Sequence, residues 1–359
     1  MRAPLTRRPA LLLVAALTVL GALPAMAQGA RPSPLTVAVG ASEPVSLRLA
    51  EDLAAALQAA GVALRPQPVG GAYGALLAAR RTPGVQLAIV PGDLPAFLDR
   101  RATRADAAGA AGLVAEIGMI AALDARPVHL LARGGKRAIE DLGGARIAIG
   151  PLDGPTAATA ALLLDAARVR PGQIDTRPPE VAITALITGE IDAMFVASPV
   201  PDPLLARAID AADGIRLLPL ALPAGVAGHE PARLAPGSYP FFAEPVDTVA
   251  VRTALVAYLY AGSTCGALEF LAEELVVALP TLIRHGSPMW STVVLDAPTG
   301  FAGHPCGLAP GATAPATALP AAAEAPAAAE AAPNEKAPAE AGRQLMQAIG
   351  SFLGGGSAE

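Results

Sequence analysis

Short apolar runs alternate with helix-forming segments in two separate parts of this 359-residue chain, and this alternation constrains the fold more than any other feature. The first part is expected to contain strands 35–39, 62–68 and 85–90 and helices 47–60 and 72–80. The second part is expected to contain strands 146–149, 174–177 and 191–196 and helices 156–167 and 181–188. Continuous apolar strands separated by helices predict parallel sheets covered on both faces. The two sets therefore predict an α/β fold of two lobes, each a doubly wound sheet, with a cleft and a hinge between them.

The loops at the strand ends form the candidate binding site, because ligands of doubly wound sheets bind beyond the carboxyl ends of the strands. Five loops rich in glycine and polar residues would line the cleft. Their candidate ligand-binding residues are Gly40, Ser42, Gly71, Tyr73, Gly92, Asp93, Asp153, Gly154, Thr156 and Ser198. A purely structural explanation stays open, because glycine and proline also make ordinary turns and a tyrosine in the first turn of a helix is as often packing.

The loop before the helix 156–167 bears on the charge of the ligand. Free backbone N–H groups at a helix N-terminus suit a ligand with negative charge or acceptor oxygens. Pro155 removes one of these donors, and Asp153 is expected to cap the helix. If Asp153 and Glu43 instead faced the cleft, they would repel an anion. The sequence therefore leaves the charge of the ligand open.

The N-terminus has the pattern of a secretory signal peptide. Three arginines precede an apolar run over 10–20, and small residues at Ala25 and Ala27 form a cleavage site of the A-x-A type. This run is too short to cross a bilayer, which needs about 20 residues. We therefore expect removal of the signal peptide 1–27 and a mature periplasmic protein that begins at Gln28.

Cys265 and Cys306 are the two cysteines of the chain. In an exported protein an isolated pair is interpreted first as a disulfide bond. The bridge would close a loop of about 40 residues and contribute about 4 kcal/mol in the chain-entropy model. Two separate buried thiols are the alternative.

The composition changes after the second cysteine. Residues 307–340 are almost wholly Ala, Pro, Gly, Thr and Glu, which predicts a linker that buries too little apolar surface to fold. In the C-terminal tail 341–359, apolar residues at helical spacing predict a short amphipathic helix. This helix would either dock on an envelope partner or have no role of its own.

Charge and motif spacing argue against several function classes. Without the three arginines of the signal peptide, 23 basic residues remain against 31 acidic ones, and no basic patch predicts nucleic-acid binding. The four histidines lack the spacing of a metal site, and His129, in an apolar strand, is expected to be a core or hinge residue. No nucleophile elbow stands out either. We expect a binding protein rather than an enzyme, with no cofactor and no metal.

Several motifs give the chain a resemblance to a known family. They are PVHLLAR, EDLGGARIAIGP, GEIDAMFVAS, IRLLPL, and PGSYP followed by VDTVAV. In this order they resemble the substrate-binding subunit of TRAP transporters of the TAXI type, best over residues 117–220. The earlier segment PVGGAYGALLAARRTPGVQLAIVPGD is similar to the first-lobe helix of that family and to its strand that ends near a cleft aspartate.

The resemblance implies a fold like that of type II periplasmic binding proteins, which closes about a hinge on a small polar ligand of the amino-acid or organic-acid class. One lobe would comprise 28–125 and 221–306, and the other 126–220. The hinge would lie near 125–128 and where the chain returns after Leu218. The bound ligand would pass to the membrane permease subunits of a TRAP-type system. A periplasmic sensor or adaptor that signals through a protein partner is the alternative.

Overall fold

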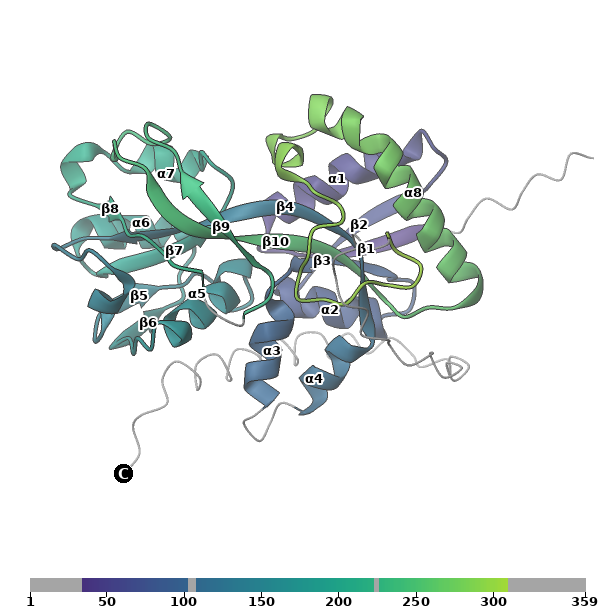
Figure 1. Cartoon of the computed structure of the whole chain (residues 1–359), viewed down its shortest axis with the longest axis horizontal. Helices are drawn as coiled ribbons and strands as arrows, with labels where there is room; N and C mark the ends of the chain where they lie inside the picture. The colour runs from purple at the N-terminus through teal and green to yellow at the C-terminus, as the bar shows by residue number, and fades with distance from the viewer. Residues whose placement is uncertain (1–33, 103–107, 223–225, 309–359) are drawn as a thin grey trace, which may run out of the picture. The chain divides into compact units, whose positions relative to one another are not determined.

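The computed structural model describes residues 34–102, 108–222 and 226–308 (Figure 1). The predicted signal peptide and the predicted linker and tail after residue 308 lie outside these residues. The strands are β1 Leu35–Gly40, β2 Leu64–Val69, β3 Leu87–Pro91, β4 Ile117–Ala132, β5 Arg146–Ala148, β6 Gln173–Asp175, β7 Ala193–Ala197, β8 Arg216–Leu217, β9 His229–Leu234 and β10 Val246–Tyr258. The α-helices are α1 Pro44–Gln58, α2 Gly71–Arg81, α3 Leu94–Ala102, α4 Ala108–Ala115, α5 Pro155–Ala166, α6 Pro179–Thr188, α7 Pro203–Ala208 and α8 Gly262–His285. Short 3₁₀-helices lie at Ile139–Leu142, Ala211–Asp213 and Pro288–Thr292.

The strands form one mixed sheet in the order β2-β1-β3-β10-β4-β7-β5-β6, with β8 beside β4 and β9 beside β10. β1 pairs in parallel with β2 and β3, and β5 pairs in parallel with β6 and β7. We call β1, β2 and β3 the first half-sheet and β5, β6 and β7 the second half-sheet. The predicted α/β fold is confirmed. The sequence did not predict the two long strands between the halves, β4 and β10, which are antiparallel to each other and to their outer neighbours.

β4 changes its strand partner where the sequence predicted a hinge. Up to Pro127 it pairs with β10, and Pro127 faces Ala250. From Val128 onward it pairs with β7, and Val128 faces Ala197. The predicted hinge segment 125–128 therefore lies inside a continuous strand, at the junction of the two half-sheets.

The chain returns to the first half-sheet along β10, and not directly after Leu218 as the sequence predicted. The backbone N–H of Leu218 donates to Leu130 of β4, so this segment still lies along the second half-sheet. Further on, Tyr239 and Phe241 pack in the same apolar cluster as Leu205 of α7. The chain crosses to the first half-sheet only along β10, whose later residues pair with β3.

Helices cover both faces of each half-sheet, because successive residues of a strand point to opposite faces. Val37 and Val39 of β1 pack in the cluster formed with α1 and α8, whereas Ala38 packs in the cluster that contains α2. In the second half-sheet, Ile147 of β5 packs in the cluster of α5, and Ala148 packs with α6. This arrangement is the two-sided covering that the alternating sequence pattern predicted.

Three of the predicted helices begin at a proline, one to three residues earlier than the sequence pattern indicated. They are α1 at Pro44, α5 at Pro155 and α6 at Pro179. Proline fits the first turn of a helix because its fixed φ suits the helix and the N–H it lacks would have no partner there. In α1 and α5, these starts place the preceding loop residues directly at the carboxyl ends of β1 and β5.

The predicted disulfide is present. Cys265, in the first turn of α8, is bonded to Cys306, with 5.5 Å between their Cα atoms. Cys265, Glu269 and Cys306 also form the one group in the described part of the chain whose ligand atoms lie close enough for a metal ion. The two sulfurs are bonded to each other and are not thiolates, so this group does not form a metal site.

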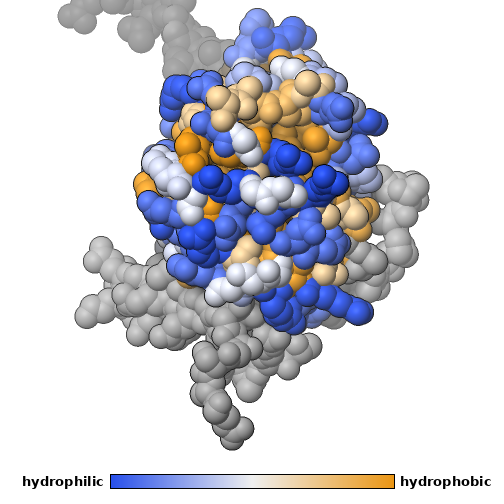
Figure 2. All heavy atoms as spheres, turned by 90° about the vertical axis from the view of Figure 1, so that its left-hand side faces the viewer, coloured by the Kyte–Doolittle hydropathy of each residue, from blue (hydrophilic) through white to orange (hydrophobic). Residues whose placement is uncertain are grey.

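Exposed apolar side chains gather on α8. Val276, Val277 and Ile283 are 48%, 71% and 47% exposed. Figure 2 shows the opposite end of the molecule, where hydrophobic residues are interspersed among hydrophilic ones. None of the helices within the described ranges is long and apolar enough to span a bilayer.

Candidate functional site

Four residues carry buried polar side-chain atoms that have no hydrogen-bond partner among the described residues. The atoms are Oε1 of Glu43, Oδ1 of Asp93, Oγ of Ser198 and both ring nitrogens of His229. Buried polar groups are nearly always hydrogen-bonded, so each exception needs an explanation. We call these four residues the candidate site. Asp93 and Ser198 were predicted from the sequence as ligand-binding residues.

Three of these residues follow strands of the two half-sheets at their carboxyl ends. Glu43 follows β1, Asp93 follows β3 and Ser198 follows β7. β1 and β3 are neighbours, with Val37 beside Leu87, and neighbouring strands lie about 4.8 Å apart. The loops that carry Glu43 and Asp93 therefore leave the sheet side by side, at the edge where the cleft was predicted.

The carboxylate of Glu43 stands at one end of a buried polar chain. The Ser46 hydroxyl donates to Oε2 of Glu43 at 2.9 Å, and Nη2 of Arg126 donates to the same hydroxyl oxygen at 2.9 Å. Arg126 also donates through Nε to Oδ2 of Asp124 at 2.8 Å, and the Thr253 hydroxyl donates to Oδ1 of Asp124. The guanidinium of Arg126 is thus committed to Asp124, and Oε1 of Glu43 receives no donor.

Burial raises the pKa of Glu43 to about 7. Arg126 and the hydrogen bond from Ser46 act in the opposite direction, while the nearby charges of Asp153 and Asp124 raise this pKa further. The carboxyl group of Glu43 therefore changes its charge close to neutral pH.

Gly40 permits the position of this carboxylate. A Cβ on Gly40 would lie 2.4 Å from Oε1 of Glu43, closer than atoms can approach. Only glycine at the end of β1 leaves room for the Glu43 side chain to fold back over the strand. Gly40 thus makes space for the Glu43 carboxylate, and its own contact with a ligand stays a prediction.

Asp93 joins the two half-sheets through α5. The hydroxyl of Thr159, on α5, donates to Oδ2 of Asp93 at 2.7 Å, and the Asp93 side chain is fully buried. Nε2 of His229, at the start of β9, lies 3.0 Å from the same oxygen but without the alignment of a hydrogen bond. Three segments distant in the sequence therefore meet at this carboxylate, and its Oδ1 is left without a donor.

The loops around Gly71 and Asp153 touch directly. The backbone N–H of Ala72 donates to the Asp153 carbonyl at 3.0 Å, and a Cβ on Gly71 would lie 2.1 Å from that oxygen. Gly71 has a φ of +51°, a left-handed conformation that favours glycine. A protein carbonyl therefore occupies the N-terminus of α2, and the two halves are in contact here.

The expectation that Asp153 caps α5 is wrong. The N-cap residue of α5 is Gly154, and no side chain bonds there. Asp153 instead presents its backbone carbonyl to α2. Its half-buried carboxylate instead contributes negative charge near Glu43.

The other predicted ligand-binding residues make contacts within the protein or face solvent. The Thr156 hydroxyl accepts from the Ala197 N–H at 3.2 Å, and the Gly92 N–H donates to the Arg252 carbonyl at 2.6 Å. Tyr73 is half-buried and packs against the apolar cluster around α2, the packing role that the sequence left open. Ser42 is exposed.

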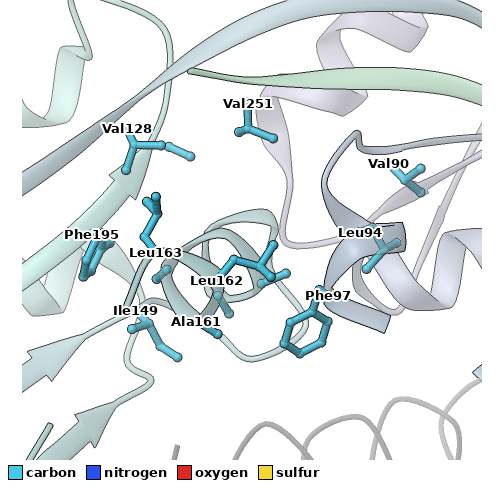
Figure 3. Close-up of a cluster of buried hydrophobic side chains, with 14 of the residues drawn as sticks. Val90, Leu94, Phe97, Val128, Ile149, Ala161, Leu162, Leu163, Phe195 and Val251 are labelled. Carbon is cyan, nitrogen blue, oxygen red and sulfur yellow. The ribbon is translucent and has the colours of Figure 1, made fainter. Parts of the chain in front are cut away.

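Beside this site, apolar side chains from both halves form one buried cluster (Figure 3). Leu162 of α5 points towards Phe97 of α3, with Leu94 on the same helix. An ion pair between Arg100 of α3 and Asp165 of α5 reinforces the contact. The two half-sheets are thus held together next to the buried acids.

His129 has the core position that the sequence predicted. It lies on β4, with Nε2 2.7 Å from the Tyr239 hydroxyl and Nδ1 3.2 Å from the Val196 carbonyl. Burial lowers the pKa of His129 to about 4, so the ring is neutral at pH 7. A neutral, hydrogen-bonded histidine here is part of the packing between β4 and β7.

The sequence interpretation did not select Glu43 and His229 as site residues. The sequence did contain a signal for Glu43, because this residue adjoins Ser42 in a loop predicted to line the cleft. The repulsion between its charge and an anionic ligand was also part of the sequence analysis. For His229 the signal was missing. It reaches Asp93 only because β9 pairs with β10, where His229 lies opposite Val251.

No family model and no curated protein matches the chain. Solved structures do resemble it. A structure described as a periplasmic transporter has 16% identity, a TM-score of 0.46 and coverage of 90% of this chain and 96% of that one. MatC from Rhodopseudomonas palustris with bound malate has 16% identity, a TM-score of 0.45 and coverage of 89% and 98%. The periplasmic binding protein BugD has 12% identity, a TM-score of 0.44 and coverage of 89% and 95%. At this degree of similarity no ligand or partner carries over to this chain.

Proposed function

We propose that the chain is a periplasmic solute-binding protein that captures a small polar ligand between its two half-sheets. The single observation that carries this proposal is the set of unpaired polar atoms in the candidate site. Glu43 and Asp93 come from the first half-sheet, and Ser198 follows a strand of the second. A ligand held between the halves would supply the hydrogen-bond partners that these buried atoms lack.

Ligand entry requires the two halves to separate. The Ala72–Asp153 hydrogen bond and the apolar contact between α3 and α5 would open, while β4 and β10 remain continuous and bend near 125–128. The two parts 28–125 with 221–306 and 126–220 are the lobes that we propose to move. The region around Tyr239, which packs with α7, would move with the second lobe.

The proposed location and transport partner rest on features of the chain. A disulfide persists in oxidising compartments such as the periplasm, and Cys265 and Cys306 form one. The signal-peptide pattern of residues 1–27 agrees with export. The motif resemblance to TAXI-type subunits supports delivery of the ligand to a TRAP-type membrane permease.

A second candidate function is a periplasmic sensor or adaptor that signals through a protein partner. The exposed Val276, Val277 and Ile283 on α8 favour it, because apolar side chains gathered on one helix mark a protein contact surface. Capture of a TRAP permease by the purified protein would support transport. Capture of a sensor kinase in its place would support the adaptor.

Thermal unfolding of the mature chain 28–359 tests ligand capture. We expect at least one compound from a panel of amino acids, organic acids, amines and sugars to raise the Tm, since a ligand at 100 times its Kd stabilises by about 2.7 kcal/mol. Ser198→Ala should weaken this binding, whereas Ser263→Ala, an exposed serine of α8, should leave it unchanged. A panel in which no compound raises the Tm would contradict the proposal.

A further inference from the structure

We propose that the ligand of the candidate site carries a cationic nitrogen, an ammonium or guanidinium group, that donates to Oε1 of Glu43 and Oδ1 of Asp93. This inference rests on the proposed solute-binding function and names the chemistry of its ligand. The two oxygens are buried acceptors without a donor, and their loops leave neighbouring strands of the same sheet.

The arginines of β4 and β10, the two long strands between the half-sheets, are each paired with an acid. Arg126 of β4 donates to Asp124, and the two side chains are 2% and 1% exposed. Arg252 of β10 donates through Nε and Nη2 to the two carboxylate oxygens of Glu230 at 2.8 and 2.9 Å. Neither arginine donates a hydrogen bond to Glu43 or Asp93, and Arg126 acts on Glu43 only through its charge and through the Ser46 hydroxyl.

An anionic group would be repelled at this position. Asp153 and Asp124 already raise the pKa of Glu43 through their charge, which shows that negative charges act on one another here. A ligand carboxylate placed beside Glu43 would add a further negative charge in a site shielded from water, where such repulsion is strong. An ammonium group would instead favour the ionised form of Glu43 and make charge-assisted hydrogen bonds, the stronger kind.

The remaining two residues fit the rest of such a ligand. The hydroxyl of Ser198 can donate or accept, and the ring nitrogens of His229 can donate or accept according to the protonation and tautomer of the ring. A polar group next to the cationic nitrogen could therefore be bound from the second half-sheet and from β9. The acids would select the charge of the ligand, and Ser198 and His229 would orient it.

Calorimetric titration of the full mature chain with probes of matched length tests this inference. Cadaverine, 1,5-pentanediol and glutarate share five carbons and end in ammonium, hydroxyl and carboxylate groups. Lysine and arginine extend the cationic set, and glutamate extends the anionic set. We expect binding within the cationic set only.

Two isosteric variants test the assigned atoms. Glu43→Gln and Asp93→Asn should each weaken binding of the cationic probe at least tenfold, because each replaces a charged acceptor by a neutral amide. Glu51→Gln, an exposed acid of α1, the helix that follows Glu43, is the matched control and should not change the affinity. Thermal unfolding of each variant confirms that it is folded.

The outcomes separate the two proposals. Binding of glutarate or glutamate without any cationic probe would overturn the inference about charge and leave solute binding in place. Cation binding that survives both Glu43→Gln and Asp93→Asn would overturn the assigned site. Stabilisation by no member of the wider panel would overturn the solute-binding proposal itself, and the inference with it.

Discussion

The acids of the two half-sheets differ in how their charge is compensated. In the second half-sheet, Nε and Nη2 of Arg146 donate to the two carboxylate oxygens of Asp192 at 3.1 and 3.0 Å. Arg177 pairs with Asp175 at 2.7 Å. At the edge of the first half-sheet, Glu43 and Asp93 are buried and receive neutral hydroxyl donors. The acids of the second half-sheet are bonded to arginines, whereas the two buried acids at the edge of the first half-sheet are not.

This difference reverses the direction of the pKa shifts. The hydrogen bond from Arg146 lowers the pKa of Asp192 below its ordinary range. Burial raises the pKa of Glu43 to about 7. A perturbed carboxyl group without an arginine partner is typical of a functional site, whereas a paired acid is typical of a scaffold.

The largest expected effect comes from Arg126→Met. This variant tests whether the buried polar chain that runs from Glu43 to Asp124 depends on its one positive charge. Removing Arg126 leaves the Asp124 carboxylate buried without its partner. Breaking a buried ion pair in this way costs about 3–5 kcal/mol. Urea unfolding at pH 7 measures the loss. A change too small to resolve would show that the charges of Arg126 and Asp124 do not stabilise one another. The two half-sheets would then not differ in how their acids are compensated.

A smaller effect is expected from Glu43→Gln, and it depends on pH. The folded-state pKa of Glu43 lies above its ordinary value of 4.5, so the folded protein holds this proton more tightly than the unfolded chain does. The stability due to protonated Glu43 is complete below pH 4.5 and is lost as the pH rises through 7. Glu43→Gln should therefore gain stability relative to the parent between pH 5 and 8, by up to about 3 kcal/mol.

The measurement is the difference in unfolding free energy between the two proteins at each pH. The titration of His129, whose pKa is lowered to about 4, is common to both and cancels in this difference. A difference that stays constant from pH 5 to 8 would contradict the raised pKa.

The smallest effect is expected from Asp192→Asn in the second half-sheet. This acid is partly exposed and its partner Arg146 more so, so solvent screens their attraction. The loss in urea unfolding should be several times smaller than that of Arg126→Met and should shrink further at about 0.5 M salt. A loss as large as that of Arg126→Met would mean that the two halves do not differ in the way described.

Much of the fold could be predicted because its signals are local. The alternation of apolar strands and helices requires only neighbouring residues, and the starts at Pro44 and Pro155 shifted the boundaries without changing the elements. The loops with Gly40, Asp93 and Ser198 could be predicted for the same reason. The full length of the strand β4 could not be predicted, because its apolar run is broken at Asp124, Arg126 and Pro127.

The chemistry of the site was harder to predict because it depends on long-range pairing. That Glu43 is buried follows from its folding back over Gly40, and the contact of His229 with Asp93 follows from the pairing of β9 with β10. The backbone carbonyl of Asp153 accepts from the Ala72 N–H, next to Gly71, which the sequence predicted as a ligand contact. Burial and strand register, rather than motif spacing, decide these roles.

The disulfide also decides how the protein would bear a mechanical load. The backbone N–H of His304 donates to Met119 of β4, and two residues later Cys306 is bonded to Cys265 of α8. A pulling force applied to the chain beyond Leu308 would first load the hydrogen bond from the Leu308 N–H to Ile120 of β4 and would then reach a covalent crosslink, before it reached the bond between His304 and Met119. Once that outer hydrogen bond had opened, the tension would pass through the disulfide bond into α8.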